Sequence, residues 1–365
     1  MKHSILIKAL TAALCLGTLA ACTAPTPNGS DTPSATTAPT SEPAASESTD
    51  AASDTESTSA ADGTNIVLSC TQELNIDKAP ARVITMGDDA MSFLWEMGLQ
   101  DTVVGMGKPL PKDVYGPEVL EALKDVPIIE GSKTEGGGAL LSTESLLALT
   151  PDIVIGFDSG ADREALTKAG VWFYSPDAWC PERKVKIGSD ETTTDAIPAS
   201  FDLVKSEARK YGEIFHQEDK AEALVKKLDG QIEAVKKAAT EDKGTAMALY
   251  LDEGNDKFFG YGAGSMIQPQ FDAVGLKNVY ADVKDRLIEG MSMEEVLKHN
   301  PQTIVIFYQH GTPEGIINTF KGIAGADQLD AVKNNRILTL QNRFADPPSP
   351  NSIRGVEKIS EFINQ

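Results

Sequence analysis

The sequence has little positive charge and little histidine, and it lacks several catalytic motifs. Its 54 acidic and 33 basic side chains give a formal charge of -21, with 4 histidines among 365 residues. A nucleic-acid-binding protein needs a basic face, so this balance argues against that class. There is no GxSxG, P-loop or HExxH motif, and no GxGxxG follows the first expected strand. These absences argue against an enzyme, and the absence of evident repeats argues against an adhesin.

The N-terminus carries an export signal. Two lysines flank the start of an apolar stretch, residues 9–21, which is too short for a permanent membrane helix. The stretch ends in Leu-Ala-Ala followed by Cys22, which resembles the bacterial lipobox, where the cysteine thiol is lipidated. The alternative is an ordinary secretory cleavage site with an incidental cysteine. We expect a signal peptide over residues 1–21 and lipidation of Cys22.

A polar segment follows the signal. Residues 23–63 contain no aromatic residue and no aliphatic residue larger than alanine, and their charged residues are all acidic. Such a segment cannot bury enough apolar surface to offset its ordering entropy. We therefore expect residues 22–64 to form a disordered tether from the lipid to a folded body. A glycosylated stalk is the alternative, and it would change the stiffness of the tether but not its role.

Cysteine is scarce in the folded body. Of the 4 cysteines, Cys15 leaves with the signal and Cys22 takes the lipid, so Cys70 and Cys180 remain. Two cysteines in an exported chain most often form a disulfide, or stay unpaired if they lie far apart. There is no CxxC motif, and no histidine is close in sequence to either cysteine. We predict a disulfide between them and no metal site.

The body alternates apolar strands with helices, which indicates an α/β fold. Its length of about 300 residues exceeds what a single core usually supports, so two lobes are expected. The clearest strands are expected at Arg82–Met86, Thr102–Gly105, Asp152–Gly156, Ala246–Leu251 and Thr303–Tyr308. Residues 199–216 and 220–239 have helical apolar spacing between the halves. We expect an N-terminal lobe over 65–196, a bridging helix over 197–216 and a C-terminal lobe over 217–365.

Three blocks of sequence resemble a known family. They are Ala81–Gly87 continuing through Leu94–Leu99 and Thr102–Gly105, then Glu144–Gly156, and in the second half Met291–Ile306. In this order they resemble the helical-backbone (class III) solute-binding proteins of ABC importers for ferric siderophores, haem and cobalamin. The resemblance covers about residues 66 to 364. It implies two Rossmann-like α/β lobes joined by a single long helix, with the ligand held between them.

In such a fold the ligand meets loops at the carboxyl ends of strands. Aromatic faces and a forked donor there suit a large, flat, partly anionic chelate. The candidate ligand-binding residues are Asp88, Arg163, Trp179, Tyr261, Tyr308 and Arg343. Further positive potential is expected from Lys133, Arg183, Lys184 and Lys186, for which a solvated surface role is the alternative.

The resemblance also implies a glutamate on each lobe that meets arginines of the permease. By block alignment these are Glu144 and Glu294. Each stands in the first turn of an expected helix, where the helix dipole alone would favour an acidic residue. Glu295 neighbours Glu294, so the second assignment is open between them.

The sequence constrains the identity of the transported ligand less than it constrains the fold. With histidine so scarce, a bare transition-metal ion is not expected, and neither is a resident cofactor. A ferric siderophore, delivered to a membrane permease with its ATPase, is the leading hypothesis. Haem is an alternative, with Tyr308 or His310 as iron ligand, and cobalamin is another. The expected location is the cell membrane, lipid-anchored on the extracytoplasmic face.

Overall fold

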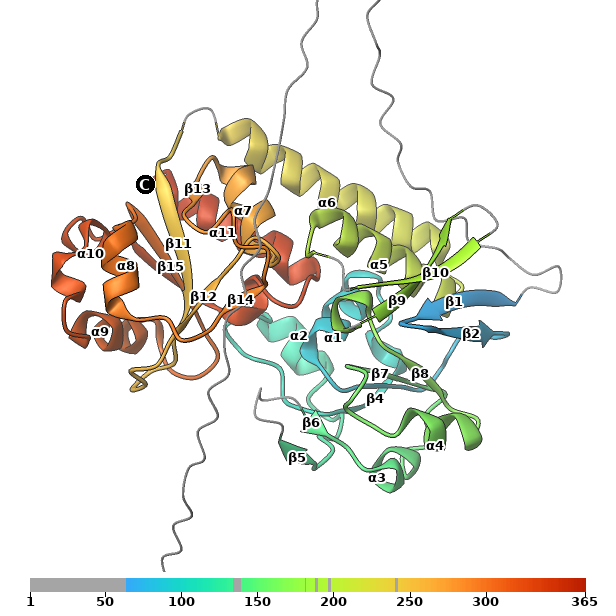
Figure 1. Ribbon diagram of the computed structural model, residues 1–365. Helices are drawn as coiled ribbons and strands as arrows, with labels where there is room; N and C mark the ends of the chain where they lie inside the picture. Colours follow the sequence, from blue (N-terminus) through green and yellow to red (C-terminus); the bar gives the residue numbers. More distant parts are fainter. Residues whose placement is uncertain (1–63, 134–138, 181, 188–189, 196–197, 240–241) are drawn as a thin grey trace, which may run out of the picture. The chain divides into compact units, whose positions relative to one another are not determined.

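A computed structural model describes residues 64–133, 139–180, 182–187, 190–195, 198–239 and 242–365 (Figure 1). The expected signal peptide, Cys22 and nearly all of the expected tether lie outside these residues. Within the described residues, no helix has both the length and the apolar character needed to cross a membrane.

The N-terminal lobe is built on a parallel sheet of four short strands in the order β4-β3-β7-β8. Their bounds are β3 Val83–Thr85, β4 Val103–Met106, β7 Ile153–Ile155 and β8 Trp172–Tyr174. Three two-stranded hairpins accompany this sheet, formed by β1 Asn65–Ser69 with β2 Gln72–Ile76, β5 Ser132–Lys133 with β6 Ala139–Leu140, and β9 Glu182–Ile187 with β10 Asp190–Asp195. The helices are α1 Asp88–Glu96, α2 Pro117–Ala122, α3 Thr143–Leu147 and α4 Arg163–Lys168, with short 3₁₀ turns η1 Gln100–Thr102 and η2 Asp177–Trp179.

The C-terminal lobe has longer parallel strands at its centre. Strand β15 pairs in parallel with β11 and β16, and β13 also pairs in parallel with β11, whereas β12 and β14 add antiparallel strands at one side. The strand bounds are β11 Thr245–Tyr250, β12 Phe259–Tyr261, β13 Lys277–Asn278, β14 Leu287–Ile288, β15 Thr303–Tyr308 and β16 Ile337–Gln341. The helical elements are α7 Ile267–Val274, α8 Met293–His299, α9 Pro313–Gly322, η3 Ala326–Gln328, α10 Asp330–Lys333, η4 Asn342–Phe344 and α11 Pro350–Ile363. The expected two-lobed α/β fold is confirmed.

Two long helices, α5 (Phe201–Phe215) and α6 (Glu218–Ala238), connect the lobes in sequence. Helix α5 contacts β1, α1 and η2, and its Tyr211 stacks on Phe93 of α1, so α5 packs with the N-terminal lobe. Helix α6 lies against α5 and also contacts α7 and α11 of the C-terminal lobe (Figure 1). Helix α6 therefore contacts elements of both lobes, and the segment 197–216 reaches the C-terminal lobe at its start, where the Ala199 N–H donates to the Gly264 carbonyl at 3.1 Å. Sequence periodicity could not separate the two helices, because both have an apolar face. The limits of the lobes stay a prediction.

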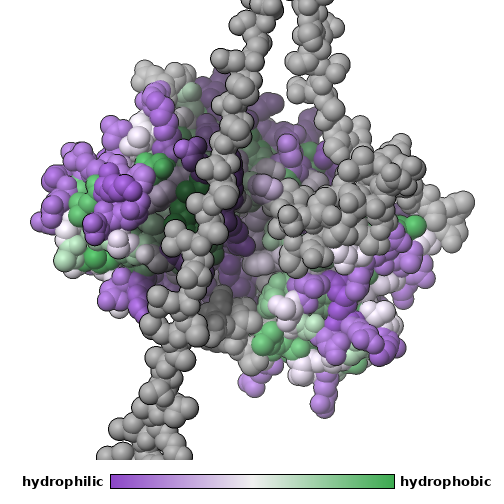
Figure 2. Space-filling view, viewed as in Figure 1, coloured by the Kyte–Doolittle hydropathy of each residue, from purple (hydrophilic) through white to green (hydrophobic). Residues whose placement is uncertain are grey.

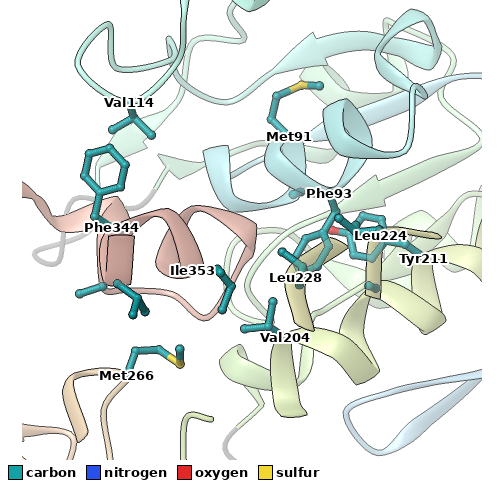
Figure 3. Packing of buried hydrophobic residues seen from close by; sticks show 14 of the residues in the cluster. Met91, Phe93, Val114, Val204, Tyr211, Leu224, Leu228, Met266, Phe344 and Ile353 are labelled. Atoms are coloured by element: carbon teal, nitrogen blue, oxygen red, sulfur yellow. The ribbon is translucent and has the colours of Figure 1, made fainter. Parts of the chain in front are cut away.

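The lobes share one large hydrophobic cluster at this end. It contains Phe93 of the N-terminal lobe, Tyr211 of α5, Leu228 of α6, and Met266 and Ile353 of the C-terminal lobe (Figure 3). A second cluster fills the other face of the C-terminal sheet, and a third fills that of the N-terminal sheet. Because apolar burial is continuous across α5, α6 and α11, separating the lobes there would expose core surface to water.

Candidate functional site

Side chains that follow the carboxyl ends of parallel strands meet between the lobes. Asp88 and Asp89 follow β3, and Trp179 follows β8, while Arg343 follows β16 on the opposite lobe. We call the contacting set the interlobe junction; it comprises Asp88, Asp89 and Trp179 of the N-terminal lobe with Arg286, Arg343 and Asp346 of the C-terminal lobe. Figure 2 shows hydrophilic surface between the two lobes. The junction lies at the edge where α/β folds hold ligands.

Asp88 joins the two lobes through charge. Its carboxylate is buried, with Lys108 Nζ at 3.1 Å from the same lobe and Arg343 Nε at 2.8 Å from the other. Neither of its oxygens has a well-aligned hydrogen bond to any described residue. Asp88 and Arg343 were both expected to bind ligand, and the structure pairs them with each other. A ligand that uses Arg343 must therefore share it with Asp88.

Asp89 points to a different partner from its neighbour Asp88. Trp179 donates its indole N–H to Asp89 Oδ2 at 3.0 Å, and Arg286 of the C-terminal lobe lies 5.6 Å above the Trp179 ring. The pKa of Asp89 is raised, chiefly because burial disfavours the charged form. Helix α1 begins at Asp88 with Gly87 as its N-cap, so the two carboxylates lie inside the helix rather than capping it. Asp89 therefore holds the orientation of Trp179.

Arg286 is the junction residue that the sequence did not reveal. Its guanidinium makes an ion pair with the buried carboxylate of Asp346, donating from Nε and from Nη2. The loop that carries Arg286 lies on Gly262 and Gly264, where an added Cβ would come within 2.2 Å of Asp285 O and 2.4 Å of Lys284 O respectively. Two glycines spaced by one residue after a strand were the available signal, since they allow a close backbone approach.

A chain of hydrogen bonds reaches the junction from α11. Asn351 Nδ2 donates to Tyr115 Oη at 3.0 Å, and the Tyr115 hydroxyl donates to the Asp88 carbonyl. Arg354 donates to the carbonyl of Val114 at 2.8 Å. Tyr115 and Asn351 also line a cavity of about 340 Å³ between α1, α2, α6 and α11. The start of α11 is thus fixed to the N-terminal lobe beside Asp88.

Tyr261 and Tyr308, the two aromatic residues of the C-terminal lobe that were expected to contact ligand, are almost completely buried. Tyr261 is 2% exposed and packs edge-on against Phe259 and Phe307. Tyr308 is also 2% exposed, and its pKa is raised first by burial and then by Asp113. Tyr261 belongs to the hydrophobic cluster that the lobes share, and Tyr308 belongs to the second cluster, on the other face of the C-terminal sheet. Trp179 is half-buried and presents a face to Arg286.

His310, the alternative iron ligand, is exposed and follows β15. Its Nδ1 lies 3.1 Å from Asp252 Oδ2, and the backbone N–H groups of Gln309 and His310 each donate to Asp252 Oδ1 at 2.8 Å. These contacts fix the loop and one ring nitrogen. Among the described residues, no three acidic, histidine or cysteine side chains gather in a way that would hold a metal ion.

Arg163 is not brought to the junction. It donates to Ser69, Gln72, Asp158 and the carbonyl of Phe173, all in the N-terminal lobe, and stacks on the Phe173 ring. These contacts tie α4 to the β1–β2 hairpin. The side chains of Lys133, Arg183, Lys184 and Lys186 lie outside the part that the structure describes.

The structure joins Cys70 and Cys180 in a disulfide with Cα atoms 5.1 Å apart. Cys180 follows Trp179 directly, and Cys70 lies in the turn between β1 and β2. The bond therefore anchors the segment that presents Trp179 to the junction.

The two expected docking glutamates occupy equivalent helix positions. Ser142 caps α3 and Ser292 caps α8, and in each helix the glutamate is the second residue after the capping serine. Glu144 and Glu294 are exposed. Glu295 instead contacts His299 and Lys298 of its own helix at 3.2 Å and 3.5 Å.

Comparison with known proteins gives consistent matches. A family described as periplasmic binding protein matches residues 97–344. The uncharacterized ABC transporter substrate-binding lipoprotein YvrC of Bacillus subtilis is 24% identical over 295 residues, which cover 80% of this chain and 82% of that protein. The petrobactin-binding protein YclQ of the same organism is 25% identical over 274 residues, covering 73% and 76%.

Solved structures show the same fold. A structure from Saccharomonospora viridis, described as an ABC-type Fe3+-hydroxamate transport system, is 29% identical with a TM-score of 0.70, covering 82% of this chain and 99% of that one. The periplasmic heme-binding protein RhuT from Roseiflexus is 19% identical with a TM-score of 0.59, covering 77% and 97%. The second likeness concerns the fold alone.

Proposed function

Because the chain belongs to the periplasmic binding protein family, we propose that it captures a ferric siderophore between its lobes and delivers it to an ABC importer. The observation that carries this proposal is the interlobe junction, where Trp179 of one lobe faces Arg286 of the other. An aromatic face beside guanidinium groups suits a chelate whose iron-bound oxygens carry partial negative charge. The relatives named for petrobactin and for Fe3+-hydroxamate transport support the same class of cargo.

The test is a fluorescence titration of the purified full chain with ferric siderophores, haem and cobalamin. A bound ferric chelate should quench Trp179, and Trp179→Phe should remove most of the quenching. Trp172→Phe is the matched control, because Trp172 lies on β8 and makes none of the junction contacts described above. Binding of haem with no response to any siderophore would replace the siderophore by haem, and binding of cobalamin alone would do the same for cobalamin.

We further propose that Glu144 and Glu294 seat the protein on its permease. Their equivalent positions after capping serines present one exposed carboxylate on each lobe, which basic pockets of a partner can recognise. Glu295 is engaged within α8, which favours Glu294 over its neighbour. Changing Glu144 and Glu294 to alanine should abolish uptake and leave chelate affinity unchanged. A loss of affinity, or full uptake, would contradict this assignment.

We also propose that Cys22 carries a lipid that holds the protein at the outer face of the membrane. The support is the lipobox-like sequence and the lipoprotein relative. In cells grown with labelled palmitate, the wild-type chain should take up label, and Cys22→Ala should not.

A further inference from the structure

We infer that the chelate held at the interlobe junction has no net negative charge and carries hydrogen-bond donors, as a neutral or cationic ferric hydroxamate does. This inference rests on the proposed function and narrows its cargo. It departs from the partly anionic chelate that the sequence suggested, and two independent features of the junction carry it: its charge balance and its unfilled hydrogen-bond acceptors.

The arginines at the junction are already neutralised. Arg343 is held by Asp88 at 2.8 Å, and Arg286 by the buried carboxylate of Asp346. Lys108 lies 3.1 Å from Asp88 as well. Among the described side chains, each junction arginine is thus paired with a buried carboxylate, and Lys108 shares Asp88 with Arg343. An incoming anion therefore finds both described arginines of the junction already engaged by carboxylates.

An anionic ligand could use Arg343 only by drawing it away from Asp88. That would leave a buried carboxylate without its interlobe partner, next to a second negative charge on the ligand. Removing one partner from a buried ion pair is far more costly than the pair itself is favourable. A neutral chelate avoids this cost, because its iron-bound oxygens can accept from guanidinium N–H groups while the ion pair stays in place.

The unfilled hydrogen-bonding capacity consists of acceptors. Oδ2 of Asp88, Oδ1 of Asp346 and Oδ1 of Asn342 are buried without a hydrogen bond of good geometry to any described residue, whereas Oδ1 of Asp88 is engaged by Arg343 and Lys108. Buried acceptors of this kind are satisfied in nearly all folded proteins, so each is available to a donor from a ligand or from water. Amide N–H and ammonium groups of a hydroxamate chelate supply such donors. The Trp179 ring, over which Arg286 lies at 5.6 Å, also attracts cations through its face.

The experiment compares chelates of different charge on the full chain by Trp179 quenching. The probes are ferrioxamine B, which is cationic, ferrichrome, which is neutral, and ferric enterobactin, which is a polyanion. Both hydroxamates should bind at least about tenfold more tightly than the catecholate, since each tenfold is one unit in log Kd. Equal or tighter binding of the catecholate would overturn the inference while leaving the proposed function intact. Failure of all three, with haem binding, would overturn the proposed function itself.

A charge-neutral variant tests the cause. Asp88→Asn keeps the shape of the side chain but releases Arg343, so the preference for hydroxamate over catecholate should shrink by about tenfold or more. Asp125→Asn removes one negative charge from an exposed site on the same lobe and is the matched control. If the two variants change the ratio of affinities equally, long-range charge explains the preference, and the role of the Asp88–Arg343 pair is overturned. Circular dichroism of both variants confirms that each is folded.

Discussion

Both lobes are built on parallel strands with helices, but they are stabilised by different interactions. The N-terminal sheet has strands of three or four residues, whereas β11 and β15 at the centre of the C-terminal sheet have six each. Among the described residues, the buried charged side chains of the N-terminal lobe and α5 are Asp88, Asp89, Asp177 and Glu207, against Asp346 in the C-terminal lobe. The disulfide lies in the N-terminal lobe, and residues 217–365 contain no cysteine.

This difference indicates which interactions stabilise each lobe. The C-terminal lobe relies on β15, which is buried along its whole length. The N-terminal lobe supplies two of the three carboxylates of the junction, Asp88 and Asp89, and burying charge opposes folding unless it is compensated. A disulfide that constrains the unfolded chain supplies part of the compensation. Changes of redox conditions and of pH should therefore act on the stability of the protein mainly through the N-terminal lobe and α5.

The largest expected effect comes from removing the disulfide. Replacing Cys70 and Cys180 by serine should lower the free energy of unfolding of the N-terminal lobe by about 2–5 kcal/mol. Urea denaturation followed by tryptophan fluorescence reports this lobe selectively, because Trp95, Trp172 and Trp179 all lie in it. Because the two lobes share one hydrophobic cluster, the circular dichroism change should move to lower urea together with the fluorescence change.

Reductant provides the control for the disulfide. Adding it should shift the wild-type fluorescence transition by the same amount and leave the serine variant unchanged. If the serine variant unfolds at the same urea concentration as the oxidised wild-type protein, the stability of the N-terminal lobe does not depend on the disulfide.

The second effect concerns Glu207 of α5. Burial first, and the charge of Asp177 second, raise the pKa of Glu207 from its ordinary value of 4.5 to about 7. Its oxygens accept hydrogen bonds from the Tyr174 hydroxyl and from the Asp177 N–H, and Lys210 pairs with Asp177 at 2.6 Å. The folded state thus binds a proton more tightly than the unfolded state. Stability is therefore fully present below about pH 4.5 and decreases as the pH rises to about 7, by on the order of 3 kcal/mol.

Glu207→Gln should remove this pH dependence, because the amide has the same shape and no charge. The difference in unfolding free energy between variant and wild type should be small at pH 4.5 and should favour the variant above pH 7. Glu233→Gln, at an exposed position of α6, is the matched control and should show no such trend. A constant difference across the range would mean that Glu207 keeps the same protonation state throughout.

Some of these features could be predicted from the sequence, and others could not. The buried strand β15 and the partnership of the two cysteines depend on local pattern or on elimination, and the structure has both the strand and the bond. The pairing of Asp88 with Arg343 depends on how the lobes face each other, which no local pattern encodes. Each residue looked available to a ligand when taken alone.

Arg286 was missed for a related reason. Its contact with Trp179 joins positions over 100 residues apart, and its orientation depends on the glycine pair that lets its loop lie close. That α6 contacts both lobes likewise could not be read from periodicity, because α5 and α6 have similar apolar spacing. Residue type thus predicts which side chains have suitable chemistry, whereas packing between lobes decides which of them are already engaged.

The smallest expected effect lies in the helix that both lobes share. On α6, Asp229 pairs with Lys205 of α5 at 3.0 Å, whereas Gln231 donates to Glu357 of α11 at 2.9 Å. Gly230 separates these contacts, and a Cβ added there would have no heavy atom within 4 Å. Glycine in the middle of a helix costs about 0.5–1 kcal/mol relative to alanine. Gly230→Ala should raise the unfolding free energy by that amount, measured by urea denaturation.

The variant also tests whether Gly230 is a pivot between the lobes. If bending at this residue contributes to lobe opening, Gly230→Ala should slow the dissociation of a bound ferric chelate as well as stabilise the helix. Gly322→Ala, at the last residue of α9 with no heavy atom near an added Cβ, is the matched control for the substitution. Stabilisation with an unchanged dissociation rate would mean that ligand release does not require bending of α6 at Gly230.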